Sequence, residues 1–245
     1  MAAGIIMLFS SVAARAQTPG ERIRNAPDGR IRMTFAARPG VCGDGENLSM
    51  GRGRSDDSDW ECLPGPVRLV LTKSGGEIVR VRTFVGGRWR EGATSFDLGT
   101  VSAPEAAAFL TDLAEHGEGR AARDAIMPAT FADSAVVWPA LLRVARDDDR
   151  PRRNRKAAQQ WVGMAAGQAV LERAGAVTVE DPDSDSRERA VFAMSQLPRE
   201  ESVPELIDIA RSHRDPRIRK TALFWLGQAE DPRAIDLLEE VLRNR

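Results

Sequence analysis

The residue types that most often carry chemistry are scarce in this chain of 245 residues. It contains two cysteines, Cys42 and Cys62, and two histidines, His116 and His213, which lie far apart in the sequence. Neither histidine belongs to a G-x-S-x-G or H-E-x-x-H motif, and these four residues are too few and too dispersed for a typical zinc site. We therefore expect no catalytic residues, no bound metal and no cofactor.

The two cysteines bracket a Gly- and Asp-rich segment and suggest a disulfide. In an oxidising compartment, an even and minimal cysteine count favours one bond between Cys42 and Cys62. Closing that loop would stabilise the fold by about 3 kcal/mol in the chain-entropy model. Two free thiols are the alternative. A bond would also remove both thiols as nucleophiles.

The first 16 residues resemble a secretory signal peptide. The chain is apolar from Ala2 to Ala14 and then reads Ala14-Arg15-Ala16, which is typical of cleavage after Ala16. No lysine or arginine precedes the apolar run, so a buried N-terminal helix or a start site placed too late are alternatives. Neither this run nor any later one is long enough to span a bilayer. We expect a periplasmic or secreted protein with no stable membrane insertion after signal removal.

The composition argues against nucleic acid as a partner. The formal net charge is −1, aromatic residues make up 5% of the chain, and tyrosine is absent. The chain thus has neither a net positive field nor an obvious stacking platform for bases. The basic run at 150–156 lies beside three aspartates. The acidic run at 181–188 lacks the glycine and the final carboxylate of a calcium loop.

Residues 17–100 carry the strand-like patterns. In "GRIRMTFAA" (29–37) Ile31, Met33 and Phe35 fall on one face, which is the period-2 signal of a half-buried strand. Residues 66–89 read as a hairpin that turns at Ser74-Gly75-Gly76. The segment 39–66 is too polar to pack by itself. These patterns predict a small antiparallel β unit.

From Ser102 onward the pattern becomes helical, and we assign residues 101–245 to a helical domain. Ser102 is a plausible N-cap with Glu105 three residues later. Residues 118–133 predict a helix interrupted by proline. In 136–146 five residues recur at helical spacing and form one apolar face: Val137, Ala140, Leu141, Val144 and Ala145.

One sequence pattern recurs three times at a step of 32 residues, beginning at 155, 187 and 219. Ala158, Ala190 and Ala222 share one column, and Gly163 and Gly227 share another, where we expect tight packing near helix ends. Amphipathic stretches follow the second and third copies. A single helix pair of this size cannot cover its own apolar face, so we expect the pairs to stack side by side with the alanines in equivalent positions.

Residues 134–245, above all "DPRIRKTALFWLG" and "VPELIDIAR", resemble the HEAT-repeat family, especially short bacterial HEAT-like repeats also found in phycobilisome-linker lyases. The resemblance implies a mainly α protein with a C-terminal α-solenoid of HEAT-like helix pairs. Over 164–186 the expected second helix is replaced by a short helix and an acidic loop, which makes the first repeat degenerate. The resemblance also implies a polar ladder between successive repeats, formed by Arg155, Asp183, Arg187, Asp215 and Arg219.

A stack of helix pairs presents an extended surface, lined by each second helix, that suits a protein or peptide. We expect a non-enzymatic exported binding or scaffold protein whose partner is an unidentified protein or peptide. An accessory or lyase-type protein acting on a cofactor or protein substrate is the alternative, by analogy of fold alone. The residues expected to face a partner are Arg143, Arg146, Glu205, Asp208, Arg211, Asp236, Glu239 and Glu240.

Overall fold

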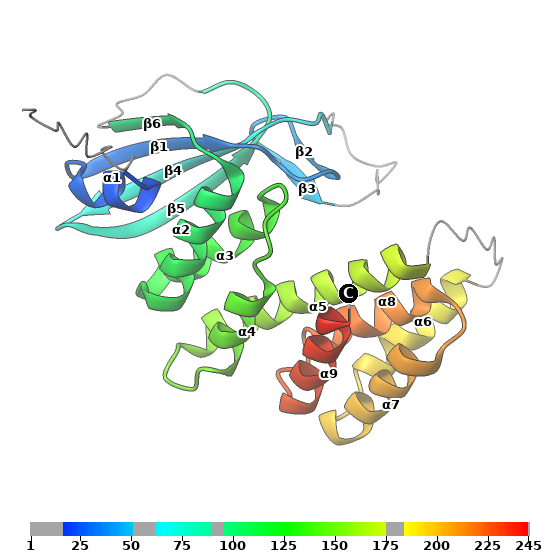
Figure 1. The fold of residues 1–245 in the computed structure, drawn as a ribbon. Helices are drawn as coiled ribbons and strands as arrows, with labels where there is room; N and C mark the ends of the chain where they lie inside the picture. Colours follow the sequence, from blue (N-terminus) through cyan, green and yellow to red (C-terminus); the bar gives the residue numbers. More distant parts are fainter. Residues whose placement is uncertain (1–16, 51–61, 90–95, 175–183, 245) are drawn as a thin grey trace, which may run out of the picture.

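The computed structural model describes residues 17–50, 62–89, 96–174 and 184–244. The predicted signal peptide, residues 1–16, and Asp183 lie outside these ranges. Figure 1 shows a β-sheet at one end of the molecule, two helices beneath it, and a group of further helices leading away from them.

The main sheet has the strand order β5-β4-β1-β6. Strands β1 (Gly29–Phe35), β4 (Val67–Ser74) and β5 (Glu77–Val85) pair antiparallel, as predicted. Gly75 and Gly76 both have positive φ, as a two-residue hairpin turn requires. The prediction of a purely antiparallel unit is wrong at one edge, because β6 (Phe96–Thr100) pairs parallel to β1. The chain leaves β5 at one edge and reaches β6 at the other by a long crossover connection.

One face of this sheet packs against helices. Helices α2 (Ala103–His116) and α3 (Gly119–Phe131) cover it, and their apolar residues join those of the strands in one core. Pro128 lies inside α3 without ending it. Helix α1 (Pro19–Asn25) is held at its C-terminus by Lys73, whose buried Nζ donates to the carbonyls of Ile23, Arg24 and Ala26 at 3.2, 2.7 and 2.7 Å. An ammonium group at a helix C-terminus is electrostatically favourable.

The disulfide between Cys42 and Cys62 is confirmed, with a Cα–Cα distance of 5.1 Å. The described part of the segment that it closes, residues 43–50, is more regular than its polarity predicts. Two short strands, β2 (Val41–Gly43) and β3 (Leu48–Met50), form a hairpin there. The Gly43 N–H also donates to the Leu63 carbonyl at 2.9 Å, so backbone bonds support the covalent bond.

From residue 138 onward, the described residues form six helices. Helix α5 differs from the prediction of a separate short helix after residue 163, because it continues past Gly163 and Gly167 to Ala174 as one helix. Alanine-rich sequence carries it through these glycines. The expected acidic loop falls largely on residues 175–183, which lie outside the described ranges. The helices are α4 (Trp138–Arg146), α5 (Arg152–Ala174), α6 (Ser184–Ser195), α7 (Arg199–Ser212), α8 (Pro216–Leu226) and α9 (Pro232–Arg243).

Helices α5 and α8 cross at their aligned glycines. A Cβ added to Gly163 would lie 2.7 Å from the Gly227 Cα, and one added to Gly227 would lie 2.9 Å from the Gly163 Cα. Gln159 Nε2 donates to the Leu226 carbonyl, while Gly167 faces Lys220. Residues farther along α5 therefore contact residues nearer the start of α8, so the two helices run antiparallel.

The helices stack in an order that differs from their order in the chain. Helix α8 packs against α5 on one side and against α6 and α7 on the other (Figure 1). The copies of the repeated pattern thus lie in the order α5, α8, α6. Ala158 and Ala222 are fully buried, but Ala190 on α6 is exposed, so the prediction of three equivalent positions is wrong for Ala190.

Two helical hairpins account for this order. The sequence "WPALLRVAR" of α4 matches "VPELIDIAR", which lies within α7, and the copies in α5 and α8 follow them. The hairpins α4–α5 and α7–α8 are thus equivalent, and they meet through α5 and α8. The C-terminal helix α9 contacts all four of these helices. It buries Ala234, Leu237, Leu238 and Leu242 there.

Candidate protein-binding surface

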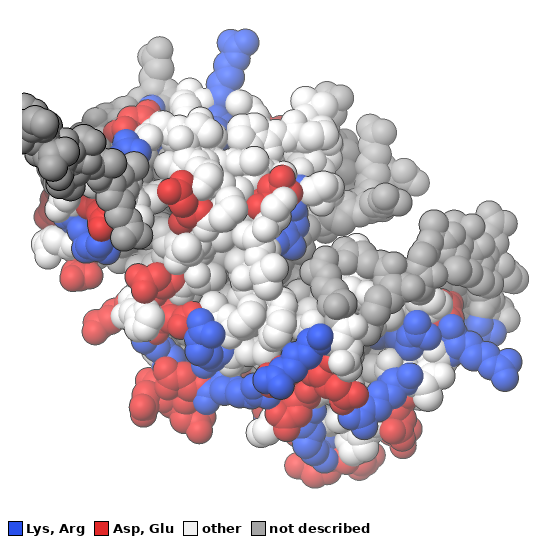
Figure 2. All heavy atoms as spheres, viewed as in Figure 1, with Lys and Arg blue, Asp and Glu red and all other residues white. Residues whose placement is uncertain are grey.

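The eight charged residues predicted to face a partner lie on α4, α7 and α9. Seven of them are exposed, and Glu239 is half-buried. Figure 2 shows basic and acidic side chains intermixed over the helical part of the molecule. These three helices therefore expose charged side chains of both signs.

Most of these charges are paired with one another across helix boundaries. Arg146 of α4 binds Asp236 of α9 at 2.8 Å and also binds Glu239. Arg211 of α7 binds Glu240 of α9 at 2.8 Å. Arg146 and Arg211 end the matching sequences of α4 and α7. Equivalent arginines thus hold α9 from both sides.

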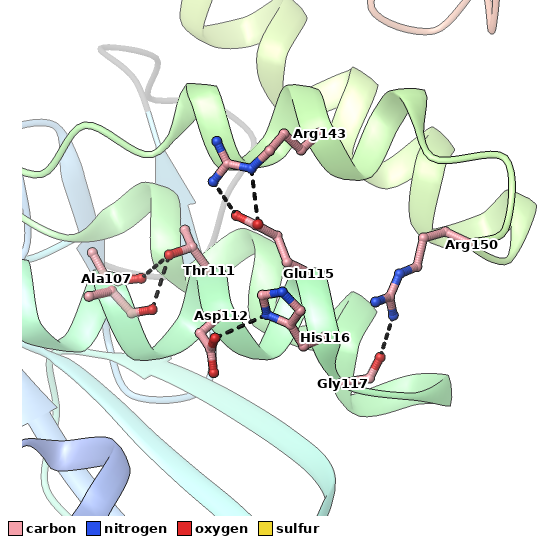
Figure 3. A network of polar contacts seen from close by, with 9 residues as sticks. Ala107, Thr111, Asp112, Glu115, His116, Gly117, Arg143 and Arg150 are labelled. Carbon is pink, nitrogen blue, oxygen red and sulfur yellow. Dashed lines mark hydrogen bonds and ion pairs between the residues drawn. The ribbon is translucent and has the colours of Figure 1, made fainter.

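Arg143 connects α4 to the sheet side of the molecule. Its Nε and Nη2 donate to the two carboxylate oxygens of Glu115 on α2, at 3.0 and 2.7 Å (Figure 3). Close by, Arg150 donates to the Gly117 carbonyl at 2.7 Å, at the end of the same helix. Bidentate arginine–carboxylate pairs are among the stronger polar contacts in proteins. Glu115 could not be predicted from the sequence, because its partner Arg143 lies 28 residues away.

The pKa values of Glu239 and Arg143 reflect these ion pairs. The hydrogen bond from Arg146 lowers the pKa of Glu239, although burial acts in the opposite direction. The hydrogen bond to Glu115 raises the pKa of Arg143, which likewise favours the charged form of the side chain. The ion pairs thus favour the charged forms of Glu239 and Arg143.

A second polar cluster fixes the turn between α8 and α9. Burial raises the pKa of Glu230, but hydrogen bonds from Arg152 and Lys156 outweigh it, so the pKa is lowered overall. The Arg152 contact is bidentate at 2.7 and 3.1 Å. Glu230 has a φ of 51°, and Asp231 then caps α9 by accepting from the Arg233 N–H. These ion pairs anchor the start of α9 to α5.

Two open depressions lie beside α4, and together we name them the α4 groove. The first has a volume of about 470 Å³ and lies between α4 and α9, with Trp138 and Leu142 among its lining residues. The second, of about 370 Å³, lies between α4 and α2 and includes Val136, whose exposed fraction of 72% is high for an apolar residue. Pro139 and Arg143 line both. The groove thus combines apolar side chains with a charged rim.

Three residues of the expected polar ladder, Arg155, Asp215 and Arg219, make local contacts. Arg155 donates to the carbonyls of Asp148 and Arg150, and Arg219 donates to that of His213, all in the turns ahead of their own helices. Asp215 caps α8 by accepting from the Arg217 N–H at 2.8 Å. These contacts lie within repeats, where we expected contacts between repeats. A turn before a helix leaves carbonyls unpaired, and a guanidinium with five donors can satisfy several of them. Arg187 is exposed on α6.

The two histidines stay apart in the fold. His116 pairs with Asp112 at 3.0 Å on the exposed side of α2 (Figure 3), whereas the Asp215 N–H contacts His213 ahead of α8. Within the described ranges, no group of three or more His, Cys, Asp or Glu residues could hold a metal ion. In the same ranges, no helix has both the length and the apolar character needed to cross a membrane.

Comparison with known proteins gives one match. Residues 171–245 match the family model for HEAT repeats, and helices α6 to α9 lie within this range. A search of the curated proteins and a search of the solved structures returned no match. Proteins built from HEAT repeats generally serve as scaffolds for protein interaction. The C-terminal part of this chain is therefore similar to HEAT repeats.

Proposed function

We propose that this chain is a non-enzymatic binding protein that holds a segment of a partner protein in the α4 groove. The α4 groove supports this proposal most directly, because an apolar floor with a polar rim is the usual anatomy of a protein-binding site. Its lining combines Trp138, Leu142 and Val136 with charged residues at the edge. Aromatic and aliphatic anchors in such grooves supply most of the binding energy.

The charges at the rim have a different role. Arg143 and Arg146 already bind Glu115, Asp236 and Glu239 within the chain. A partner would therefore gain little net energy from new ion pairs, because each would compete with an existing one. The mixed signs would instead orient the partner and make its association rate sensitive to salt.

The further proposal is that the protein acts outside the cytoplasm. The disulfide between Cys42 and Cys62 is compatible with an oxidising compartment, where such bonds persist. The apolar start of the sequence supports a periplasmic or secreted location in the same way.

A lyase-type accessory role for the chain is the second candidate. It rests on the sequence resemblance to the repeats of phycobilisome-linker lyases. The local chemistry favours binding, because Arg143, Arg146 and Arg243, which line the α4 groove, form ion pairs within the chain.

A peptide selection tests the proposal. The full chain is used to select peptides from a random display library, and the selected peptides are titrated by calorimetry. We expect peptides with regularly spaced apolar residues, and we expect Val136→Arg to weaken them at least tenfold. Val79→Arg is the matched control, because Val79 is an exposed valine, at 47%, on strand β5. Peptides that bind V136R as tightly as the unchanged protein would refute the proposed site.

A further inference from the structure

Helix α6 carries an apolar stripe that points to solvent. Four of its apolar residues recur at the i, i+3, i+4 and i+7 spacing that lines one face of a helix. We name them the α6 stripe: Ala190, Ala193, Met194 and Leu197. Leu197 lies in the turn after the helix, where its N–H donates to the Met194 carbonyl at 3.1 Å. Ala190, Ala193 and Leu197 are exposed, and Met194 is half-buried.

The equivalent positions are covered in the other two copies of the repeated pattern. They are Ala158, Trp161, Val162 and Ala165 on α5, and Ala222, Trp225, Leu226 and Ala229 on α8. All eight lie in the hydrophobic core or pack against it. The Trp161 ring contacts Phe131 with the ring centroids 5.9 Å apart, and the Trp225 ring contacts Phe192 at 5.1 Å. A neighbouring element thus covers this stripe on α5 and on α8, whereas most of the α6 stripe is exposed.

The place of α6 in the stack accounts for this difference. The copies lie in the order α5, α8, α6, and α6 makes its main contacts with α8 and α7. Among the described helices, α8 therefore has neighbours on both sides, whereas α6 ends the row (Figure 1). Helical-repeat proteins need a polar outer face at the end of such a row to stay soluble. The α6 stripe is apolar instead, as is typical of a surface that binds another protein.

The surface around the stripe is uncharged. Residues 190–198 contain no charged side chain. Phe192 widens the apolar area, because it is 47% exposed although its ring contacts Trp225. In a two-fold dimer the same surface patch lies on both sides of the contact, so a patch of one charge would repel itself. An uncharged apolar patch meets no such repulsion and is therefore suited to a second copy of the chain.

We propose that the α6 stripe pairs with the same stripe of a second copy of this chain and forms a two-fold symmetric dimer. When the two-fold axis passes through the middle of the stripe, the two α6 helices run antiparallel. Ala193 then lies against Met194 of the partner subunit, and Ala190 lies against Leu197 of the partner subunit. Each alanine leaves room for the larger side chain opposite, as in the packing of ridges into grooves. The stripe is therefore complementary to itself in size.

The dimer would continue the row of helices from one chain into the other. The order α5, α8, α6 of one copy would be followed by α6, α8 and α5 of the second copy, so each chain covers the apolar end of the other. A two-fold contact uses the same patch on both chains, so the assembly closes at two copies and does not grow into a filament. Helix α6 lines neither depression of the α4 groove, so this inference is independent of the proposed binding site.

Sedimentation velocity of the full chain at pH 7, across a hundredfold range of protein concentration, tests the inference. We expect a reversible dimer that Ala193→Glu weakens at least tenfold, because two carboxylates then meet beside the symmetry axis. Ala193→Lys alone is expected to weaken the dimer in the same way. An equimolar mixture of A193E and A193K is expected to form the dimer again, since opposite charges then meet. The control is Val79→Glu on strand β5, because Val79 is as exposed as Leu197, at 47%, and we expect a change of less than twofold.

Three results would overturn the inference. The first is an unchanged protein that stays monomeric at every concentration, which would leave the α6 stripe to a different protein. The second is a dimer of A193E as tight as that of the unchanged protein, which would place the contact elsewhere. The third is a mixture of A193E and A193K that stays monomeric, which would contradict the two-fold pairing. Ala193 is exposed, so circular dichroism of dilute samples is expected to show the same melting temperature in each protein. Leu197→Glu, in the turn after α6, is a second variant of the stripe and is expected to weaken the dimer as A193E does.

Discussion

Gly163 and Gly227 bring α5 and α8 into backbone contact, and each glycine occupies the space in which the other would carry a Cβ. They hold equivalent positions in two copies of one sequence pattern. The contact is therefore reciprocal and joins the hairpins α4–α5 and α7–α8. A side chain at either position would push the two helices apart.

Gly163→Ala is expected to lower the free energy of unfolding by about 1–3 kcal/mol, the usual cost of overpacking. The atoms in the way belong to the backbone, which cannot rotate aside. Gly167→Ala is the control in the same helix, because the nearest atom there is the flexible Lys220 Cγ at 3.0 Å. Urea denaturation measures the stability of both variants, and equal midpoints would disprove the tight crossing of α5 and α8.

Lys73→Met is expected to loosen α1 and to destabilise the protein by about 1–3 kcal/mol, since it leaves buried carbonyls without donors. The ammonium group donates to three carbonyls at the end of α1. Amide hydrogen exchange will show faster exchange in residues 19–25. Arg80→Met provides the control, because Arg80 is exposed on the other face of the sheet. Unchanged protection of α1 in K73M would be evidence against this anchor.

Stability is expected to fall as the pH drops through the ordinary carboxyl range near 4. The pKa values of Glu230, Asp231 and Glu239 are all lowered in the folded state, so the unfolded state binds protons first. Their contribution is complete above the ordinary carboxyl pKa and is lost below it.

Glu230→Gln isolates part of this effect. The variant is expected to be less stable at pH 7 and to approach the unchanged protein as the pH falls to 3. Glu205→Gln, on the exposed side of α7, is expected to follow the unchanged protein at every pH. Thermal melts between pH 3 and 7 measure the stability of the unchanged protein and of the two variants. A constant difference between E230Q and the unchanged protein would contradict the ion pairs of Glu230.

Removing the disulfide by Cys42→Ser/Cys62→Ser is expected to cost about 2–5 kcal/mol. The intact protein, treated with an alkylating reagent without reductant, is expected to keep its mass. Alkylation of two thiols in the native protein would mean that Cys42 and Cys62 are not bonded.

Local patterns predicted the elements of this fold well. The alternation of Ile31, Met33 and Phe35 marked a strand that buries all three, and Gly75-Gly76 marked a hairpin turn. Hydrophobic periodicity also located α4 and α9. Each of these features depends on residues close together in the sequence, so a single sequence contains the information.

Neighbours in space were harder to predict. The repeated pattern does not identify which helix covers each copy, and Ala190 is exposed on α6 although its counterparts Ala158 and Ala222 are buried. The same limit applies to the candidate site. Arg143 was expected on the surface, but its partner Glu115 belongs to a helix of the sheet region, and the α4 groove depends on that juxtaposition.

Cross-linking of paired cysteines tests the packing order most directly. In a solenoid that follows chain order, α4 would lie beside α7, whereas here α4 lies beside α9. A short bis-maleimide is therefore expected to link Arg146→Cys to Asp236→Cys, but not to Asp208→Cys. The native cysteines do not react with the reagent, because they are bonded to each other. A link between positions 146 and 208, without one between 146 and 236, would contradict the order of helices on which the α4 groove rests.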